Sequence, residues 1–125
     1  MRRSLVLVLI MIVCISCDIN NQKLLLVNKT NYPIYYRILT DTILNTELQL
    51  YEIPIDDTVK PNFVMGGHGA WEYAINKRSS DSTLYIFIFA TDKITVDAIN
   101  NRQFRRFDYK VKDLEAINWV IVLSK

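Results

Sequence analysis

The stretch Leu84-Tyr85-Ile86-Phe87-Ile88-Phe89-Ala90 decides the fold of this chain. It is built from β-branched and aromatic residues, which are typical of strands. Successive side chains of a strand point to opposite faces, so the aliphatic residues share one face and the three aromatic residues share the other. Both faces are apolar. The stretch therefore predicts a central strand in a sheet that is covered on both sides.

A polar turn is expected before this strand, and three further elements are expected after it. Ser79–Ser82 is a polar turn that leads into it, and Phe104–Tyr109 has the composition of another strand. Apolar residues then recur at three-residue spacing from Val111 through Leu114 to Ile117, which predicts a short helix with one buried stripe. Trp119–Leu123 is an apolar run that predicts a closing strand.

Upstream, two runs are expected to pair as an early hairpin. Lys23–Asn28 and Pro33–Thr40 are rich in apolar and β-branched residues and are separated by a polar turn cluster. Glu47–Ile53 alternates at first and predicts a third strand. The prolines at positions 54 and 61 then bracket a loop that contains Asp56 and Asp57, because proline donates no hydrogen bond to a central ladder.

Strands dominate this pattern, and its spacing of strands and turns favours a β-sandwich over alternating strands and helices. We expect a mainly β, single β-sandwich-like domain over residues 24–125, with one short helix near the C-terminus. No internal repeat or low-complexity linker is evident in the sequence.

The N-terminal segment has the parts of an export signal. Arg2 and Arg3 precede the uncharged run Leu5–Ile15, which is shorter than the ~20 residues that a membrane-spanning helix needs. The ending Ile15-Ser16-Cys17 resembles a bacterial lipobox. We expect a lipoprotein signal peptide over residues 1–16, with Cys17 lipidated and residues 17–23 forming a short tether. The alternative is an ordinary secreted protein with Cys17 as a free thiol.

Charge and cysteine content exclude several classes of function. Removal of Arg2 and Arg3 with the signal leaves 13 of the 15 basic residues, equal to the 13 acidic residues. The densest remaining basic cluster, Arg102, Arg105 and Arg106, is short and interrupted by phenylalanines, so no nucleic-acid partner is expected. Cleavage also removes Cys14, which leaves no thiol for a disulfide, a metal or a nucleophilic reaction.

The second half of the chain, roughly residues 60–123, resembles a group of small uncharacterised lipoproteins of Bacteroidota-type bacteria. The resemblance rests on residues 84–89 with Asp92 and Ile94, on Asp113-Leu114-Glu115, on Asn118-Trp119 and on Trp71. It implies a lipid-anchored protein of the cell envelope, at the outer membrane, and no activity. Two positions depart from the group: Ala90 replaces a common acid, and Lys110 replaces a Ser or Thr. Because lysine cannot accept the hydrogen bond of a helix cap, we expect the following helix to fray at its start.

Few residues suggest chemistry. His68, the single histidine, lies among all three glycines in Gly66-Gly67-His68-Gly69, which is neither a dinucleotide-binding nor a phosphate-binding spacing. We interpret it as an exposed turn; a ligand or metal role is the alternative. Asp56-Asp57 is interpreted as a solvated turn. No serine lies in a nucleophile-elbow pattern. We therefore expect no enzyme activity, no cofactor and no metal.

The aromatic residues are the remaining candidates for a binding surface. We expect Trp119 and the aromatic residues of 84–90 to be core, because a small domain without disulfides needs large buried side chains. Trp71, beside the glycines, is predicted to be exposed. Trp71 and His68 are therefore the candidate binding residues.

Three functions remain open from the sequence. The leading hypothesis is a membrane-anchored envelope lipoprotein that acts as a non-catalytic binding or structural module, with a protein or glycan partner. The second is a small inhibitor or immunity-type protein, which a protruding loop over 66–69 would favour. The third is an envelope hydrolase, which would need a cleft that joins His68 to carboxylates.

Overall fold

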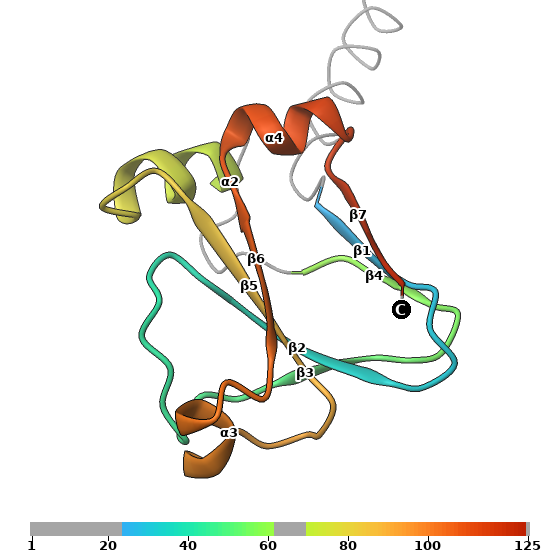
Figure 1. Cartoon of the computed structure of the whole chain (residues 1–125). Coiled ribbons are helices and arrows are strands. Elements are labelled where there is room, and N and C mark those ends of the chain that lie inside the picture. Colours follow the sequence, from blue (N-terminus) through green and yellow to red (C-terminus); the bar gives the residue numbers. More distant parts are fainter. Residues whose placement is uncertain (1–23, 62–69, 125) are drawn as a thin grey trace, which may run out of the picture.

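The computed structural model describes residues 24–61 and 70–124, and within them the protein is mainly β (Figure 1). The strands are β1 (Leu25–Asn28), β2 (Ile34–Leu39), β3 (Tyr51–Ile53), β4 (Thr58–Val59), β5 (Leu84–Phe89), β6 (Arg105–Tyr109) and β7 (Val120–Leu123). The helices are α2 (Ala70–Tyr73), α3 (Val96–Asn100) and α4 (Val111–Ala116), and α2 continues directly into a π-helical turn, η1 (Ala74–Arg78).

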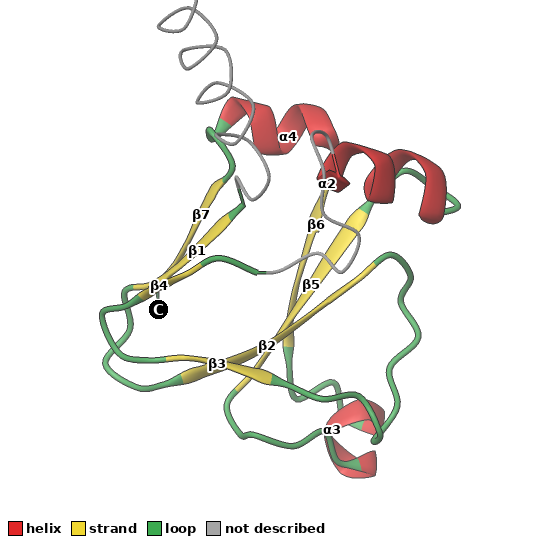
Figure 2. Ribbon diagram, turned by 180° about the vertical axis from the view of Figure 1, so that it is seen from behind, coloured by secondary structure: helices red, strands yellow, loops and turns green. Residues whose placement is uncertain are grey.

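These strands form two sheets. The first has the order β4-β1-β7, with β1 antiparallel to β4 and parallel to β7. The second has the order β3-β2-β5-β6 and is antiparallel throughout. Figures 1 and 2 show α2 and α4 at one end of the sheets and α3 at the opposite end.

The prediction for the central strand is confirmed, because all six residues of β5 are buried and the strand lies between β2 and β6. Its inner face, Leu84, Ile86 and Ile88, belongs to a core cluster that includes residues of β1 and β7 from the other sheet. Its outer face, Tyr85, Phe87 and Phe89, forms a second cluster with apolar residues of the 39–50 segment and of the chain around α3. The strand is therefore covered on both sides, as its composition requires.

The predicted early hairpin is wrong, because β1 and β2 belong to different sheets. Asn28, fully buried at the end of β1, provides the physical reason. Its Nδ2 donates to the carbonyl oxygens of Tyr32, Ile53 and Pro54 at 3.0, 3.0 and 3.2 Å. Its Oδ1 accepts from the backbone N–H of Thr30 at 2.9 Å. These bonds hold a turn that carries the chain from one sheet to the other.

The helix prediction is partly correct. A helix does begin at Val111 and buries Leu114, but Ile117 lies beyond its end and is exposed. The described chain has three short α-helices rather than one, and its last element is strand β7. Fraying at the start of α4 was expected, yet the Asp113 carboxylate accepts a hydrogen bond from the Lys110 N–H at 2.9 Å. The acid at the third helical position thus bonds the backbone of the N-cap residue Lys110 and supplies half of a capping box.

Two further predictions, the burial of Trp119 in the last strand and a strand over Glu47–Ile53, are partly correct. Trp119 is buried, as expected, but lies just before β7 rather than in it, with a left-handed φ of 61°. The Trp119 backbone N–H donates to the carbonyl of Leu114 at 2.8 Å, which closes the turn out of α4.

The predicted strand over Glu47–Ile53 shrinks to the three residues of β3. This shortening leaves an open edge beside β2, where the candidate site lies.

Candidate functional site

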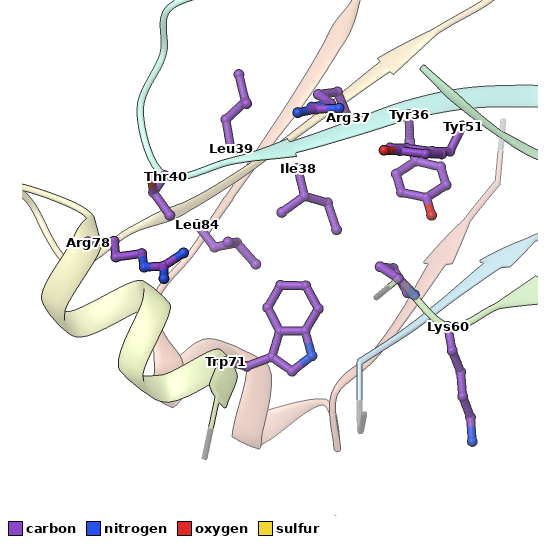
Figure 3. Close-up of a pocket in the computed structure, with 11 residues that line it drawn as sticks. Tyr36, Arg37, Ile38, Leu39, Thr40, Tyr51, Lys60, Trp71, Arg78 and Leu84 are labelled. Carbon is purple, nitrogen blue, oxygen red and sulfur yellow. The ribbon is translucent and has the colours of Figure 1, made fainter. Parts of the chain in front are cut away.

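A pocket of about 450 Å³ opens at the edge of the four-stranded sheet, between β2 and the helical segment α2–η1 (Figure 3). Strand β3 pairs with β2 only as far as Tyr36, so β2 lacks a neighbour on that side beyond this residue in the described chain. The lining residues come from five separate segments: Tyr36, Arg37, Ile38, Leu39, Thr40, Tyr51, Lys60, Pro61, Trp71, Arg78 and Leu84.

The floor of the pocket is apolar. Ile38 and Leu84 belong to β2 and β5 and pack with the inner core cluster. Trp71 lies opposite them on α2, and Figure 3 shows its indole facing the gap below β2. A flat aromatic wall opposite branched aliphatic side chains suits a planar apolar group, because such surfaces are poorly hydrated.

Tyr36 brings a polar group into this apolar setting. Its side chain is only 7 % exposed, and its hydroxyl points into the pocket (Figure 3). No described hydrogen bond joins this hydroxyl to another described residue. Burial, followed by the influence of Tyr51, raises the pKa of Tyr36 above its ordinary value of 10.0. The hydroxyl is therefore neutral at physiological pH and able to donate a hydrogen bond.

The rim carries three cationic side chains, each from a different element. Arg37 lies on β2, Lys60 follows β4, and Arg78 ends η1. Arg37 is held in place, because its Nη1 donates to the carbonyl of Gln49 at 3.1 Å and its guanidinium lies 5.8 Å from the ring centre of Tyr51. The described lining includes no aspartate or glutamate. The charged side chains on the described lining are therefore all cations.

The prediction that Trp71 is exposed is wrong, since its side chain is only 3 % exposed and belongs to the inner core cluster. The glycine-rich sequence before it suggested a surface turn, but Ala70 and Trp71 begin a helix that packs onto the sheet. The residue nevertheless lines the pocket, so its role in binding stays a prediction. Cys17 and His68, the other candidates, lie outside the described residues.

The remaining sequence candidates do not meet in a site. Asp56 and Asp57 are exposed in a turn, as predicted, with Asp56 at a left-handed φ of 53°. Arg105 and Arg106 are exposed on the edge strand β6, where Arg106 pairs with Asp108 at 2.9 Å. Among residues 24–61 and 70–124, no group of three His, Cys, Asp or Glu side chains could hold a metal ion. In the same residues, no helix is long and apolar enough to cross a bilayer.

A second polar cluster ties the start of β5 to the start of α4. The Tyr85 hydroxyl and the Ser79 hydroxyl both donate to the Asp81 carboxylate, and the Lys110 Nζ donates to the Asp81 carbonyl at 2.9 Å. The bond from Tyr85, then that from Ser79, lowers the pKa of Asp81 below its ordinary value. The bond to Asp81 is also the main cause that raises the pKa of Tyr85. These contacts fix the turn that the sequence predicted over Ser79–Ser82.

Sequence reasoning missed Tyr36, Arg78 and Lys60 as site residues. Each lies in a different element, and nothing in its local sequence marks it. Only the alternation of β2, which places Tyr36 and Ile38 on the same face, could have indicated that these two side chains lie together.

Comparison with protein-family models, curated proteins and solved structures gives no match for this chain. The resemblance to envelope lipoproteins therefore stays a prediction from the residues that suggested it.

Proposed function

We propose that this chain is a lipid-anchored protein of the cell envelope that binds a small ligand without transforming it. The observation that carries the binding role is the pocket beside β2, with its apolar floor and the inward hydroxyl of Tyr36. Ligand pockets commonly have volumes of about 300–1,000 Å³ and combine an apolar lining with a few polar groups. The pocket of about 450 Å³ fits that description.

We also infer a sandwich-like packing of the two sheets. One core cluster contains side chains from β1 and β7 of the first sheet and from β2, β3 and β5 of the second. Shared burial of this kind is what stabilises two sheets that pack face to face. The pocket would then lie at the margin of the sandwich, where β3 ends.

The anchoring part of the proposal rests on the basic start, the short apolar run and the sequence Ser16-Cys17. Diacylated cysteine binds a bilayer stably, since each buried CH₂ contributes about 0.8 kcal/mol. Cys17→Ala should leave an unprocessed precursor that incorporates no labelled fatty acid. Cleavage and export of this variant at the wild-type size would show that the anchor is not at Cys17. The outer membrane is the proposed location, and separation of the two membranes on a density gradient tests it.

The binding part can be tested with a pocket-blocking variant. Thr40 lines the pocket, whereas Thr42 is exposed two residues away and does not. Thr40→Trp should abolish calorimetric binding of small bicyclic ligands such as 2-naphthamide and 2-naphthoate to the full-length protein in lipid nanodiscs. Thr42→Trp should leave that binding intact. Failure of both ligands to bind the wild-type protein would argue against the proposed binding role.

The inhibitor and hydrolase hypotheses both depend on residues 66–69, which lie outside the described part of the chain. No described contact favours either hypothesis, so the binding module remains the proposal.

A further inference from the structure

We infer that the pocket beside β2 selects a small organic anion with a flat apolar body, such as an aromatic carboxylate. This inference rests on the proposed binding function and names its ligand class. Three observations carry it: the sign of the charge around the pocket, the shape of its floor and the hydroxyl of Tyr36.

The charge distribution favours a negative ligand. Of the three cations on the lining, Arg78 points its guanidinium toward the floor in Figure 3, whereas the Arg37 side chain lies across β2 from Ile38 and the Lys60 ammonium points away from the gap. Two acids lie close in the sequence but not on the lining: Glu72 follows Trp71 on α2, and Glu52 on β3 pairs with Tyr35, on the face of the sheet opposite to Tyr36. Arg78 is exposed, so its attraction for an anion acts partly through solvent and weakens as the salt concentration rises.

The floor favours a flat ligand body. The indole of Trp71 forms one side, and Ile38 and Leu84 form the other (Figure 3). An aromatic ring placed between them can stack on the indole and bury its second face against the aliphatic side chains. A long flexible chain would lose more conformational freedom on entering the same space.

Tyr36 supplies the group that recognises the charged end. Its side chain is more than nine-tenths buried, and its hydroxyl points into the pocket without a hydrogen-bond partner among the described residues. Because this hydroxyl stays protonated, it can donate to a carboxylate but gains less from an uncharged group. Hydrogen bonds to charged groups are about twice as strong as those between neutral groups. The Tyr36 hydroxyl thus distinguishes an acid from its neutral isostere.

The test compares two ligands of the same shape, 2-naphthoate and 2-naphthamide, by titration calorimetry on the full-length protein in lipid nanodiscs, with empty nanodiscs as the blank. The carboxylate should bind about tenfold more tightly than the amide, as a charge-assisted bond predicts. High salt should lower the affinity for the carboxylate and leave the affinity for the amide unchanged. Equal affinities for the two ligands would overturn the charge inference and leave the binding function standing. Absence of binding by both would remove the binding function itself.

Three variants assign the selectivity to residues. Tyr36→Phe and Arg78→Gln should each lower the affinity for the carboxylate about tenfold and the affinity for the amide by less than about twofold. Lys60→Gln, an exposed change outside any helix or strand, should act in the same direction and tests the charge effect if Arg78→Gln disturbs η1. The matched controls are Tyr73→Phe and Arg102→Gln, which are exposed and do not line the pocket. Losses as large in the controls as in the pocket variants would refute the assignment.

Discussion

The two faces of strand β5 are equally buried, but they are buried by different kinds of structure. The inner face packs against regular elements: strands β1 and β7 of the first sheet, together with Trp71 on α2 and Leu114 on α4. The outer face packs mainly against irregular chain, with Leu44, Leu48 and Leu50 covering its aromatic residues from one side. An irregular cover has few backbone hydrogen bonds of its own, so it depends on side-chain contacts and opens more readily.

This difference shows what a doubly apolar strand can and cannot reveal. The composition of β5 requires a cover on each side, and both covers exist. It does not say whether the cover is a sheet, a helix or a loop, because the same apolar area is buried in each case. The two covers should therefore differ in how much their loss destabilises the fold.

The largest effect is expected at the inner core. Trp119 is 5 % exposed and packs in the inner cluster. Trp119→Ala should lower the free energy of unfolding by about 3–5 kcal/mol, because it removes buried area and leaves a cavity. Urea denaturation followed by circular dichroism measures this change. A loss below about 1 kcal/mol, which is typical of surface positions, would show that the inner face is not the main core.

Trp71→Ala should have the next largest effect, about 2–4 kcal/mol. Trp71 is as buried as Trp119, but one side of its indole already faces the pocket, so its removal creates less new cavity. The denaturation midpoints of the two variants, compared in the same buffer, decide the order. A loss at Trp71 larger than at Trp119 would mean that the pocket wall is the more tightly packed region.

The outer face should be less sensitive. Phe104 is half-buried and contacts Phe87 and Phe89, with ring centres 5.5 and 5.7 Å apart. Phe104→Ala should lower the free energy of unfolding by about 1–3 kcal/mol, since each of its two aromatic pairs contributes about 0.5–1.5 kcal/mol. Hydrogen exchange should also rise in residues 40–50 before it rises in β1 and β7. Simultaneous exchange of both regions would show that the two covers open as one unit.

The smallest effect concerns pH at the edge of the outer face. The Tyr85 hydroxyl bonded to Asp81 lowers the pKa of the Asp81 carboxyl below 3.8 and raises its own above 10.0. The Asp81 contribution is therefore present above pH 3.8 and lost as pH falls through the lowered pKa, whereas the Tyr85 contribution is lost as pH rises through the raised pKa.

Tyr85→Phe should thus reduce stability by a constant amount between these limits, with the difference from wild type shrinking at both extremes. Melting temperatures recorded across the pH range check this shape. The exposed Tyr73→Phe is the control and should give a curve parallel to the wild type. If the difference between Tyr85→Phe and wild type persists unchanged at low pH, the bond from Tyr85 to Asp81 does not contribute to the stability of the turn.

The sequence was informative where local pattern alone determines the outcome. The alternation within 84–89, the spacing of Val111 and Leu114, and the polar turn at Ser79–Ser82 all predict elements that the structure contains. Each of these depends on contacts between residues close in the chain or on the burial of one continuous segment.

Long-range partners could not be predicted in the same way. The register of β1 with β7 joins residues far apart in the sequence, and the separation of β1 from β2 depends on Asn28, whose hydrogen bonds reach residues 53 and 54. The burial of Trp71 depends on where α2 packs, which the glycines before it do not reveal. The candidate pocket combines residues from β2, β3, η1 and the chain around Lys60, so no single stretch could indicate it.

The parallel pairing of β1 with β7 has a consequence for when the protein can fold. Leu25 lies beside Val120, and Asn28 beside Leu123, so the central strand of the first sheet acquires its parallel neighbour only when residues 120–123 are available. Contacts between residues so distant in sequence form slowly, because the entropy cost of closing a long loop comes before the contacts can stabilise the fold. A nascent chain therefore cannot complete this sheet before residues 120–123 have left the ribosome. If it is exported as proposed, translocation that starts before residues 120–123 are made would meet a chain in which β1 is still unpaired to β7.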